Sequence, residues 1–342
     1  PFLFFEIMRE GMRIMKEKKS GEVCGFTSRI RIAVQVFTLF MAVILACTYI
    51  EIYGAGLVPA YASPAVVKPE EGDGTADHPY KIGTAQELYW FAELVNSEKD
   101  KAACAVLTKD IEVNTGDVSG CDGKKEEGWQ EWTPIGDFSS GGYEGTFDGQ
   151  GHTISGLYFN DNEKRAGLFA RLIGAEKDAP ARVRNVGIVN SYINGEDVGG
   201  IAGQAQYAEI DQCFNTSMIT SDNKVTCCLG GIVGESFDTY IHNCFNTGTV
   251  IGKNAMFSSV AGICGYSMSS SGKLNNCYYQ AEKIDRAYNT GNQPIVTKTE
   301  GVSAEAFAAG KVTYLLNAND EAASDVWVQN VDNGNTPYWK IP

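Results

Sequence analysis

Short apolar runs broken by glycine dominate the chain after residue 154, and they recur at a fixed interval. The run "VGGIAG" at 198–203 returns as "LGGIVG" at 229–234 and "VAGICG" at 260–265, thirty-one residues apart each time. A second line follows each run: "IDQCFNT" from 210, "IHNCFNT" from 241 and "LNNCYYQ" from 274. Runs this short and this rich in glycine do not form helices, so each unit is predicted to hold about three short strands.

The connections between these strands are too short for an ordinary parallel sheet. Parallel neighbours in one flat sheet need crossovers of a dozen or more residues. A chain that makes one turn per unit avoids this, because each strand pairs with the matching strand of the next turn at about 4.8 Å. The predicted fold is therefore all-β, a right-handed parallel β-helix over residues 104–300. The hand follows the general preference of parallel crossovers.

Residues at equivalent positions of successive repeats form columns, and the repeats contain two apolar columns with a polar column between them. One apolar column holds Val183, Ile210, Ile241 and Leu274, and the other holds Val186, Cys213, Cys244 and Cys277. These columns are three residues apart, so a straight strand cannot point both inward. The residues between them are Asn185, Gln212, Asn243 and Asn276. Asparagine tolerates the left-handed conformation, so we expect a bend there, a polar ladder at the bend, and core cysteines that act as small apolar fillers.

The two ends of the repeat region differ in pattern from the repeats. Residues 84–97 place Leu88, Phe91, Ala92 and Val95 on one helical stripe, with Thr84 and Glu87 as a capping box. Residues 104–114 read as a strand. Residues 303–319 predict a helix, or two around Gly310, and a hairpin with Asn333-Gly334 at its turn follows. We expect 77–103 and 301–342 to cap the terminal turns, whose backbone and core are otherwise exposed.

The first 62 residues have the pattern of an export signal. A basic stretch precedes the apolar run 32–50, and Ala60 and Ala62 frame an A-x-A cleavage pattern. We expect cleavage after Ala62, an acidic linker over 63–76, and residues before Met12 or Met15 that are upstream translation or a fragment edge. An uncleaved membrane anchor is the alternative, because the run nearly reaches the length of a membrane span.

Charge and cysteine content narrow the function classes. The formal net charge is −14, and the chain has no clustered basic face beyond residue 31. This argues against nucleic acid as a partner, because neutralising phosphates needs clustered positive charge. Export permits disulfides, and Cys104 and Cys121, about one loop apart, are the favoured pair.

His242 and Cys244 invite a catalytic interpretation, with a cysteine nucleophile and a histidine base. The repeat argues against it. Asp211 and Asn275 replace the histidine in the neighbouring units, whereas the cysteine keeps its column. The three column cysteines could instead bind a metal, but zinc ligands must converge tetrahedrally and a stacked row does not. We therefore expect a buried, reduced Cys244 and an outward-pointing His242.

Three further groups carry candidate chemistry. Asp148 and His152 in "TFDGQGHTISG" could be the acid or base of a polysaccharide-cleaving enzyme, although the glycine dipeptides favour a turn. The loop acids Asp110, Asp117 and Asp122 match no calcium-loop spacing. Some aromatic residues could either line a sugar platform or cover an end turn. They are Trp129, Trp132, Tyr143, Tyr158 and Phe159.

From about residue 77 to 340 the chain resembles bacterial GLUG-repeat surface proteins. The matching segments, in order, are "DHPYKIGTAQELYWFAELVN", "VLTKDIEVN", "EWTPIG", "YEGTFDGQGHTISGLYFN", the three "GGIVG"-like lines, the "NCFNTGTV" lines and "AFAAGKVTYLLN…VWVQ". The resemblance implies export and a place at a bacterial surface. Related repeats occur in adhesin-like and IgA-peptidase-like proteins, and the resemblance implies no defined chemistry. "TCCLGG", with Cys227 and Cys228, departs from the pattern.

We therefore expect a secreted or cell-surface, monomeric, non-enzymatic module that acts as an adhesin-like binding or spacer protein. It is expected to have no catalytic, cofactor-binding or metal site, and to contact carbohydrate or a host or cell-wall surface. Membrane contact is expected only through an uncleaved N-terminal segment. The alternative is a polysaccharide lyase or glycoside hydrolase on the same fold, which requires convergent carboxylates.

Overall fold

The computed structural model describes residues 66–253, 255–290, 292–319, 326–333 and 336–340, and these are mostly β with little helix. The predicted signal peptide, its cleavage site and the apolar run 32–50 lie outside the described residues. Residues 63–342 form a unit of their own. In the described part of the chain, no helix has the length and apolarity needed to cross a bilayer.

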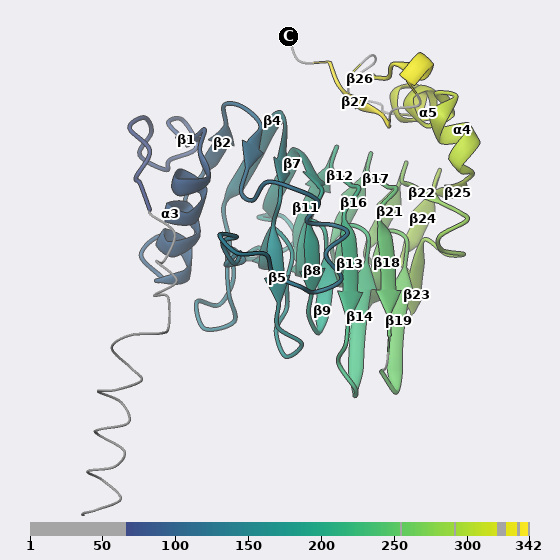
Figure 1. The fold of residues 1–342 in the computed structure, drawn as a ribbon, viewed down its shortest axis with the longest axis horizontal. Coiled ribbons are helices and arrows are strands. Elements are labelled where there is room, and N and C mark those ends of the chain that lie inside the picture. The colour runs from purple at the N-terminus through teal and green to yellow at the C-terminus, as the bar shows by residue number, and fades with distance from the viewer. Residues whose placement is uncertain (1–65, 254, 291, 320–325, 334–335, 341–342) are drawn as a thin grey trace, which may run out of the picture. The chain divides into compact units, whose positions relative to one another are not determined.

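Parallel pairing between successive repeats builds the sheets, as Figure 1 shows. One sheet runs through β6 (Phe169–Ile173), β10 (Ala202–Gln206), β15 (Val233–Phe237), β20 (Cys264–Ser267) and β23 (Tyr288–Thr290). A second holds β5 (Tyr158–Asn160), β8 (Tyr192–Asn194), β13 (Met218–Ser221) and β18 (Thr249–Gly252). A third holds β9 (Asp197–Gly199), β14 (Thr226–Gly230) and β19 (Phe257–Ala261).

The largest sheet divides into two runs that share β7 (Ala181–Val189), which pairs in turn with β4 (Thr146–Ser155). The first run continues through β11 (Ala208–Asp211), β16 (Tyr240–His242), β21 (Lys273–Asn275) and β24 (Ile295–Thr297). The second continues through β12 (Phe214–Asn215), β17 (Phe245–Asn246), β22 (Tyr278–Gln280) and β25 (Glu300–Val302). Each complete repeat thus supplies five short strands, such as β9 to β13, and the expected number of about three is wrong.

The extra strands arise where the backbone bends. Gln212 divides "IDQCFNT" into β11 and β12, and its φ is +51°. Asn185, Asn243 and Asn276 have φ values of +54°, +53° and +53°. The predicted bend at the polar column is therefore confirmed, including at glutamine, which adopts this conformation less readily than asparagine.

The bend turns both apolar columns inward, as predicted. Ile210, Ile241, Cys213 and Cys244 are fully buried. Ile210 pairs directly with Ile241 in the register of β11 and β16. The polar ladder is also present, since Asn276 Nδ2 donates to Asn243 Oδ1 at 2.7 Å.

The glycine-rich lines let two strands of one repeat approach backbone to backbone. A Cβ on Gly230 would overlap Val233 O and lie 2.6 Å from Ile263 O of the next repeat. A Cβ on Gly199 would likewise overlap Ala202 O. The glycines are therefore required by contact with backbone atoms, which cannot move aside as a side chain can.

The N-terminal helix α3 (Ala85–Asn96) covers the start of the sheets, beside β1 (Tyr80–Ile82) and β2 (Ala105–Leu107) (Figure 1). Thr84 caps the helix by accepting from Glu87 N at 3.2 Å, and Glu87 Oε2 accepts from Gly83 N at 2.8 Å. The predicted stripe is buried. The expected strand over 104–114 is in fact two, β2 and β3 (Ile111–Glu112), separated by residues 108–110.

The C-terminal segment covers more of the repeats than the last turn alone. Helices α4 (Ala304–Ala308) and α5 (Lys311–Asn319) are separated at Gly310, whose φ is +84°. These helices and the strands β26 (Trp327–Val328) and β27 (Tyr338–Trp339) pack against a column of outward-facing aromatic side chains from successive repeats. The column consists of Phe214, Phe245 and Tyr278. The segment therefore covers the side of several repeats and also reaches the last turn, where it contacts Val302 and where Lys311 Nζ lies 3.3 Å from Glu300 Oε1.

The expected C-terminal hairpin is present as an antiparallel pair, with Trp327 opposite Trp339. Its connection over 329–337 includes a 3-10 helix, Val331–Asn333, and is longer than a two-residue Asn-Gly turn. Phe214 stacks on Phe245 at 4.8 Å with an 11° interplanar angle, and Trp339 lies 4.8 Å from Phe214. These contacts bury the aromatic column beneath the hairpin.

Candidate functional site

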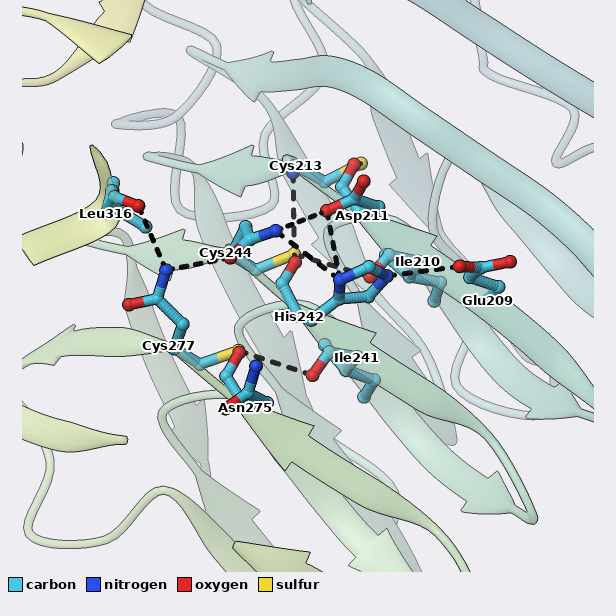
Figure 2. Close-up of polar contacts among 12 residues, drawn as sticks. Glu209, Ile210, Asp211, Cys213, Ile241, His242, Cys244, Asn275, Cys277 and Leu316 are labelled. Carbon is cyan, nitrogen blue, oxygen red and sulfur yellow. Dashed lines mark hydrogen bonds and ion pairs between the residues drawn. The ribbon is translucent and has the colours of Figure 1, made fainter. Parts of the chain in front are cut away.

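The His242 ring lies on the outer face of β16 between two carboxylates of the preceding repeat (Figure 2). Its Nε2 is 3.3 Å from Glu209 Oε1, and its Nδ1 is 3.3 Å from Asp211 Oδ1. The ring also stacks on Tyr240 at 4.2 Å with a 3° interplanar angle. Both ring nitrogens thus face acidic groups, and the contacts of His242 and Arg182 hold the pKa of Glu209 down at about 2.

Cys244 points the other way, into the core. Its Sγ donates to the His242 carbonyl oxygen at 3.0 Å and contacts Ile210 O at 3.8 Å. Cys213 N donates to Cys244 Sγ at 3.4 Å, which links successive turns. Burial, followed by the neighbouring thiols of Cys213 and Cys277, raises the pKa of Cys244 well above its usual value. The thiol is reduced and is not poised as a nucleophile, and the prediction that His242 points away from it is confirmed.

The His242 side chain is only 14% exposed and is ion-paired, and it is not an exposed neighbour of a turn as the sequence pattern suggested. We expect His242→Ala to lower the free energy of unfolding by no more than about 1 kcal/mol at pH 6, since ion pairs this close to solvent contribute little. The loss should shrink near pH 2. A lowered acid pKa stabilises the fold above the ordinary value of 4.5, and this stabilisation disappears as pH falls towards 2.

Chemical unfolding at pH 6 and pH 2 measures this effect. His152→Ala is the matched control, because His152 faces only the exposed Asp110, with 3.4 Å between Nδ1 and Oδ1. A loss above about 3 kcal/mol for His242→Ala would exceed any surface ion pair and contradict the structural role assigned here.

Asp148 and His152 do not form an acid–base pair. Asp148 is buried and accepts from Arg184 Nε at 2.8 Å, Asn185 Nδ2 at 2.9 Å and Gln150 Nε2 at 2.7 Å. These contacts saturate the carboxylate, while His152 turns to Asp110. The favoured turn is a bend within the single strand β4, with Gln150 at φ +53°.

The carboxylates of the loop acids interact with nearby backbone and side-chain groups of the protein. Asp117 Oδ1 accepts from Gly120 N at 3.0 Å, and Asp122 Oδ1 lies 3.6 Å from Lys253 Nζ. In the described ranges, no three metal-binding side chains come together. The candidate platform aromatics are at most 6% exposed, so their ring faces are not available to a sugar.

The pairing favoured for Cys104 and Cys121 is wrong: both are free thiols, and Cys121 instead packs beside Trp129 and Tyr158.

A buried charge cluster that the sequence did not predict joins β9 and β15 through Arg165. Asp197 is only 5% exposed, and its Oδ2 lies 2.9 Å from Arg165 Nε. Arg165 Nη2 is 3.7 Å from Glu235 Oε2, which also accepts from Gln204 Nε2 at 2.7 Å. Burial and the nearby Glu235 raise the pKa of Asp197 to about 6, although Arg165 opposes the shift. Cys228, in register with Asp197, belongs to the same cluster.

Ionised Asp197 should destabilise the fold. A raised acid pKa means that the folded protein holds the proton more tightly than the unfolded chain does. The destabilisation is therefore absent below the ordinary pKa of 3.8 and complete above about 6. Asp197→Asn should therefore be as stable as the native protein at pH 7.5 or more stable by up to about 3 kcal/mol. The loss of a partner for Arg165 reduces the gain.

Unfolding midpoints between pH 4 and pH 7.5 measure this effect, with the neighbouring Glu196→Gln as the control that also removes one negative charge. The native protein should lose stability relative to Asp197→Asn as pH rises through 4 to 6. Parallel pH profiles for the two proteins would show that Asp197 titrates normally.

No protein-family model matches the chain. Halomucin from Haloquadratum walsbyi is 31% identical over 158 residues, which are 46% of this chain and 1% of Halomucin. The chain thus spans a very small part of that relative.

Among solved structures, the crystal structure of a "putative immunoglobulin A1 protease" from Bacteroides ovatus has a TM-score of 0.51 and 18% sequence identity. The match covers 80% of this chain and 96% of that chain. At this level of identity the likeness shows a shared fold alone.

Proposed function

We propose that this chain is an extracellular GLUG-repeat protein whose parallel sheets wind as a right-handed β-helix. It acts as a non-enzymatic, adhesin-like binding or spacer module that contacts carbohydrate or a host or cell-wall surface. The thirty-one-residue repeat and the ordered GLUG-like segments support the family. The likeness to Halomucin supports the extracellular location.

One observation carries this proposal: equivalent positions of successive repeats bond to one another. Arg182 Nε donates to Glu209 Oε2 at 3.0 Å, and Glu209 in turn faces His242 of the next repeat. Arg171 Nε likewise donates to Gln204 Oε1 at 2.8 Å, at the paired position of the next repeat. The polar groups thus build an extended surface by repetition, as binding solenoids do.

The test is a glycan array of host and plant polysaccharides, followed by incubation of the protein with each of them and with immunoglobulin A1. We expect saturable binding to a glycan class without turnover. Release of reducing or unsaturated ends, or cleavage of the immunoglobulin, would refute the non-enzymatic function.

A glycoside hydrolase is the second candidate, and the Asp197 and Glu235 carboxylates favour it. Two carboxyl groups that flank the scissile bond are the usual requirement for glycosidic cleavage. If the array incubation releases reducing ends, Glu235→Gln should abolish the release while Glu196→Gln leaves it intact. Release that survives Glu235→Gln would exclude this pair as the catalyst.

Export is the remaining expectation. We propose that the segment before Ser63 directs secretion and is removed after Ala62. N-terminal sequencing of the exported product should begin at Ser63. A product found in the membrane fraction and still carrying residues 32–50 would support the anchor instead.

A further inference from the structure

The last repeat leaves strand β19 without a partner on one edge. In the described chain β19 pairs with β14 alone. Phe257 N donates to Val225 O of that neighbour at 3.1 Å. Since alternate residues of a parallel strand bond to opposite sides, Ser258 and Val260 direct their backbone N–H and C=O groups towards the open edge.

Strand β18 has the same open edge beside it. Thr249 N donates back to Ser217 O at 3.1 Å, so the backbone of Val250 faces outward from the sheet edge. Unpaired edges of this kind are templates for pairing with another chain.

These two edges form one wall of an open surface groove of about 420 Å³. The lining residues are Val250, Ser258, Val260, Lys283, Ile284, Asp285, Arg286 and Asn289. The loop 281–287 closes the edge further along, where Gly262 N donates to Arg286 O at 2.8 Å and Ile263 N to Ala287 O at 2.9 Å. The open edge is therefore limited to β18 and the first part of β19.

The groove is more basic than the chain as a whole. Its lining holds Lys283 and Arg286 against Asp285, or +1, in a chain of −14. Arg286 is ion-paired with Asp285, with 2.7 Å between Nε and Oδ1, so a carboxylate in the groove would meet Lys283.

Lys283 supplies a positive charge inside the groove. Its Nζ donates to Thr247 O at 2.6 Å, and no carboxylate of the described residues lies within ion-pair distance of it. Partial desolvation lowers the pKa of Lys283, because the groove removes some of the water around an ammonium that has no counter-charge. An acidic ligand would provide that counter-charge.

We propose that this groove binds an acidic polypeptide segment in extended form, which adds to β19 as one more strand. Its backbone pairs with Ser258 and Val260, and its carboxylates face Lys283. Strand addition of this type takes its affinity from the main chain and its specificity from side-chain contacts. A second copy joined at the same edge would bring the Lys283 side chains of the two copies together without a counter-charge, so charge disfavours it. This site is independent of the glycan contacts proposed above, because its ligand is a polypeptide.

The test uses a fluorescein-labelled octapeptide that alternates valine with glutamate, followed by fluorescence anisotropy. We expect saturable binding below about 1 mM that weakens at 1 M salt, where the Debye length is about 3 Å. Two matched peptides serve as controls, one with lysine for glutamate and one N-methylated at alternate backbone nitrogens. Both should bind at least tenfold more weakly.

Protein variants locate the site. Ser258→Pro removes one outward-facing N–H at a strand edge, where proline is tolerated, and should weaken binding at least tenfold. Ser258→Ala leaves the backbone unchanged and should bind within twofold of the native protein. Lys283→Gln should weaken the acidic peptide at least fivefold, which keeps the test decisive if the proline variant misfolds.

Three results would overturn the proposal. The first is the absence of saturable binding by the acidic peptide. The second is equal binding of the lysine peptide. The third is a concentration-dependent dimer in sedimentation velocity that Lys283→Gln does not weaken, since a second copy would then occupy the edge.

Discussion

Cys244→Asp is expected to lower the free energy of unfolding by about 3–5 kcal/mol, the range for a buried charge without a partner. The side chain is fully buried, and the nearest polar atoms to its Sγ include the carbonyl oxygens of His242 and Ile210. A carboxylate there would face these oxygen atoms, and the Cys213 N–H, 3.4 Å from Sγ, is a neutral donor that cannot balance its charge. Equilibrium unfolding in urea measures the loss.

The control is Cys244→Val, which keeps the apolar character and approximate shape and should cost about 1.5 kcal/mol or less. Labelling with a polar alkylating reagent completes the test, because the folded native protein should leave Cys213, Cys244 and Cys277 unmodified. Rapid alkylation of Cys244 in the folded state, or equal stability of the Asp and Val variants, would show that the thiol is accessible and not core.

Gly230→Ala should be comparably damaging, at about 3 kcal/mol or more, although it adds a single methyl group. The added Cβ would overlap Val233 O within the repeat and crowd Ile263 O of the next. Neither backbone can retreat without breaking the sheets on both sides. The expected result is a large fall in the unfolding midpoint, measured by the loss of far-ultraviolet circular dichroism.

Ala261 is the matched position, because it pairs with Gly230 in the register of β14 and β19. It already carries a Cβ, and it belongs to the last repeat, where the loop 281–287 replaces a further strand. Ala261→Gly should therefore cost about 1 kcal/mol, mainly through backbone entropy. If Gly230→Ala costs no more than this, the glycine is not required by close backbone contact.

The core of the repeats could be predicted because it follows strict spacing. The cysteine and isoleucine columns are three residues apart, and a left-handed residue between them is the simplest way to turn both inward. The position of the C-terminal segment could not be predicted as readily. Phe214 and Phe245 follow the inward cysteines and so face outward, and two outward aromatics in register indicate a covered face. These outward aromatic residues predict that something covers this face, but they do not identify the segment that does so.

The arrangement of the candidate site residues could be predicted only where the repeat fixes the direction of their side chains. The repeat places His242 outward and Cys244 inward, and the structure agrees. The Asp197 cluster lacks such a pattern. Arg165 and Asp197 hold equivalent positions in successive repeats, because Ala166 pairs with Val198. The same column continues with Cys228 and Ser259, so its residue type changes at every repeat and no periodicity marks the cluster. Only the close approach of β9 and β15 brings these charges together.

The C-terminal segment has a consequence for how the protein unfolds. In a simple solenoid each repeat touches only its neighbours, so partial unfolding can start at one end and stop. Here β27 lies beside β4, and the same segment contacts Phe214, Phe245 and Val302 from different turns. Fraying of one turn therefore exposes a surface shared with distant turns. The repeats are joined into a single cooperative unit, which resists the stepwise loss of structure that a nearest-neighbour stack allows.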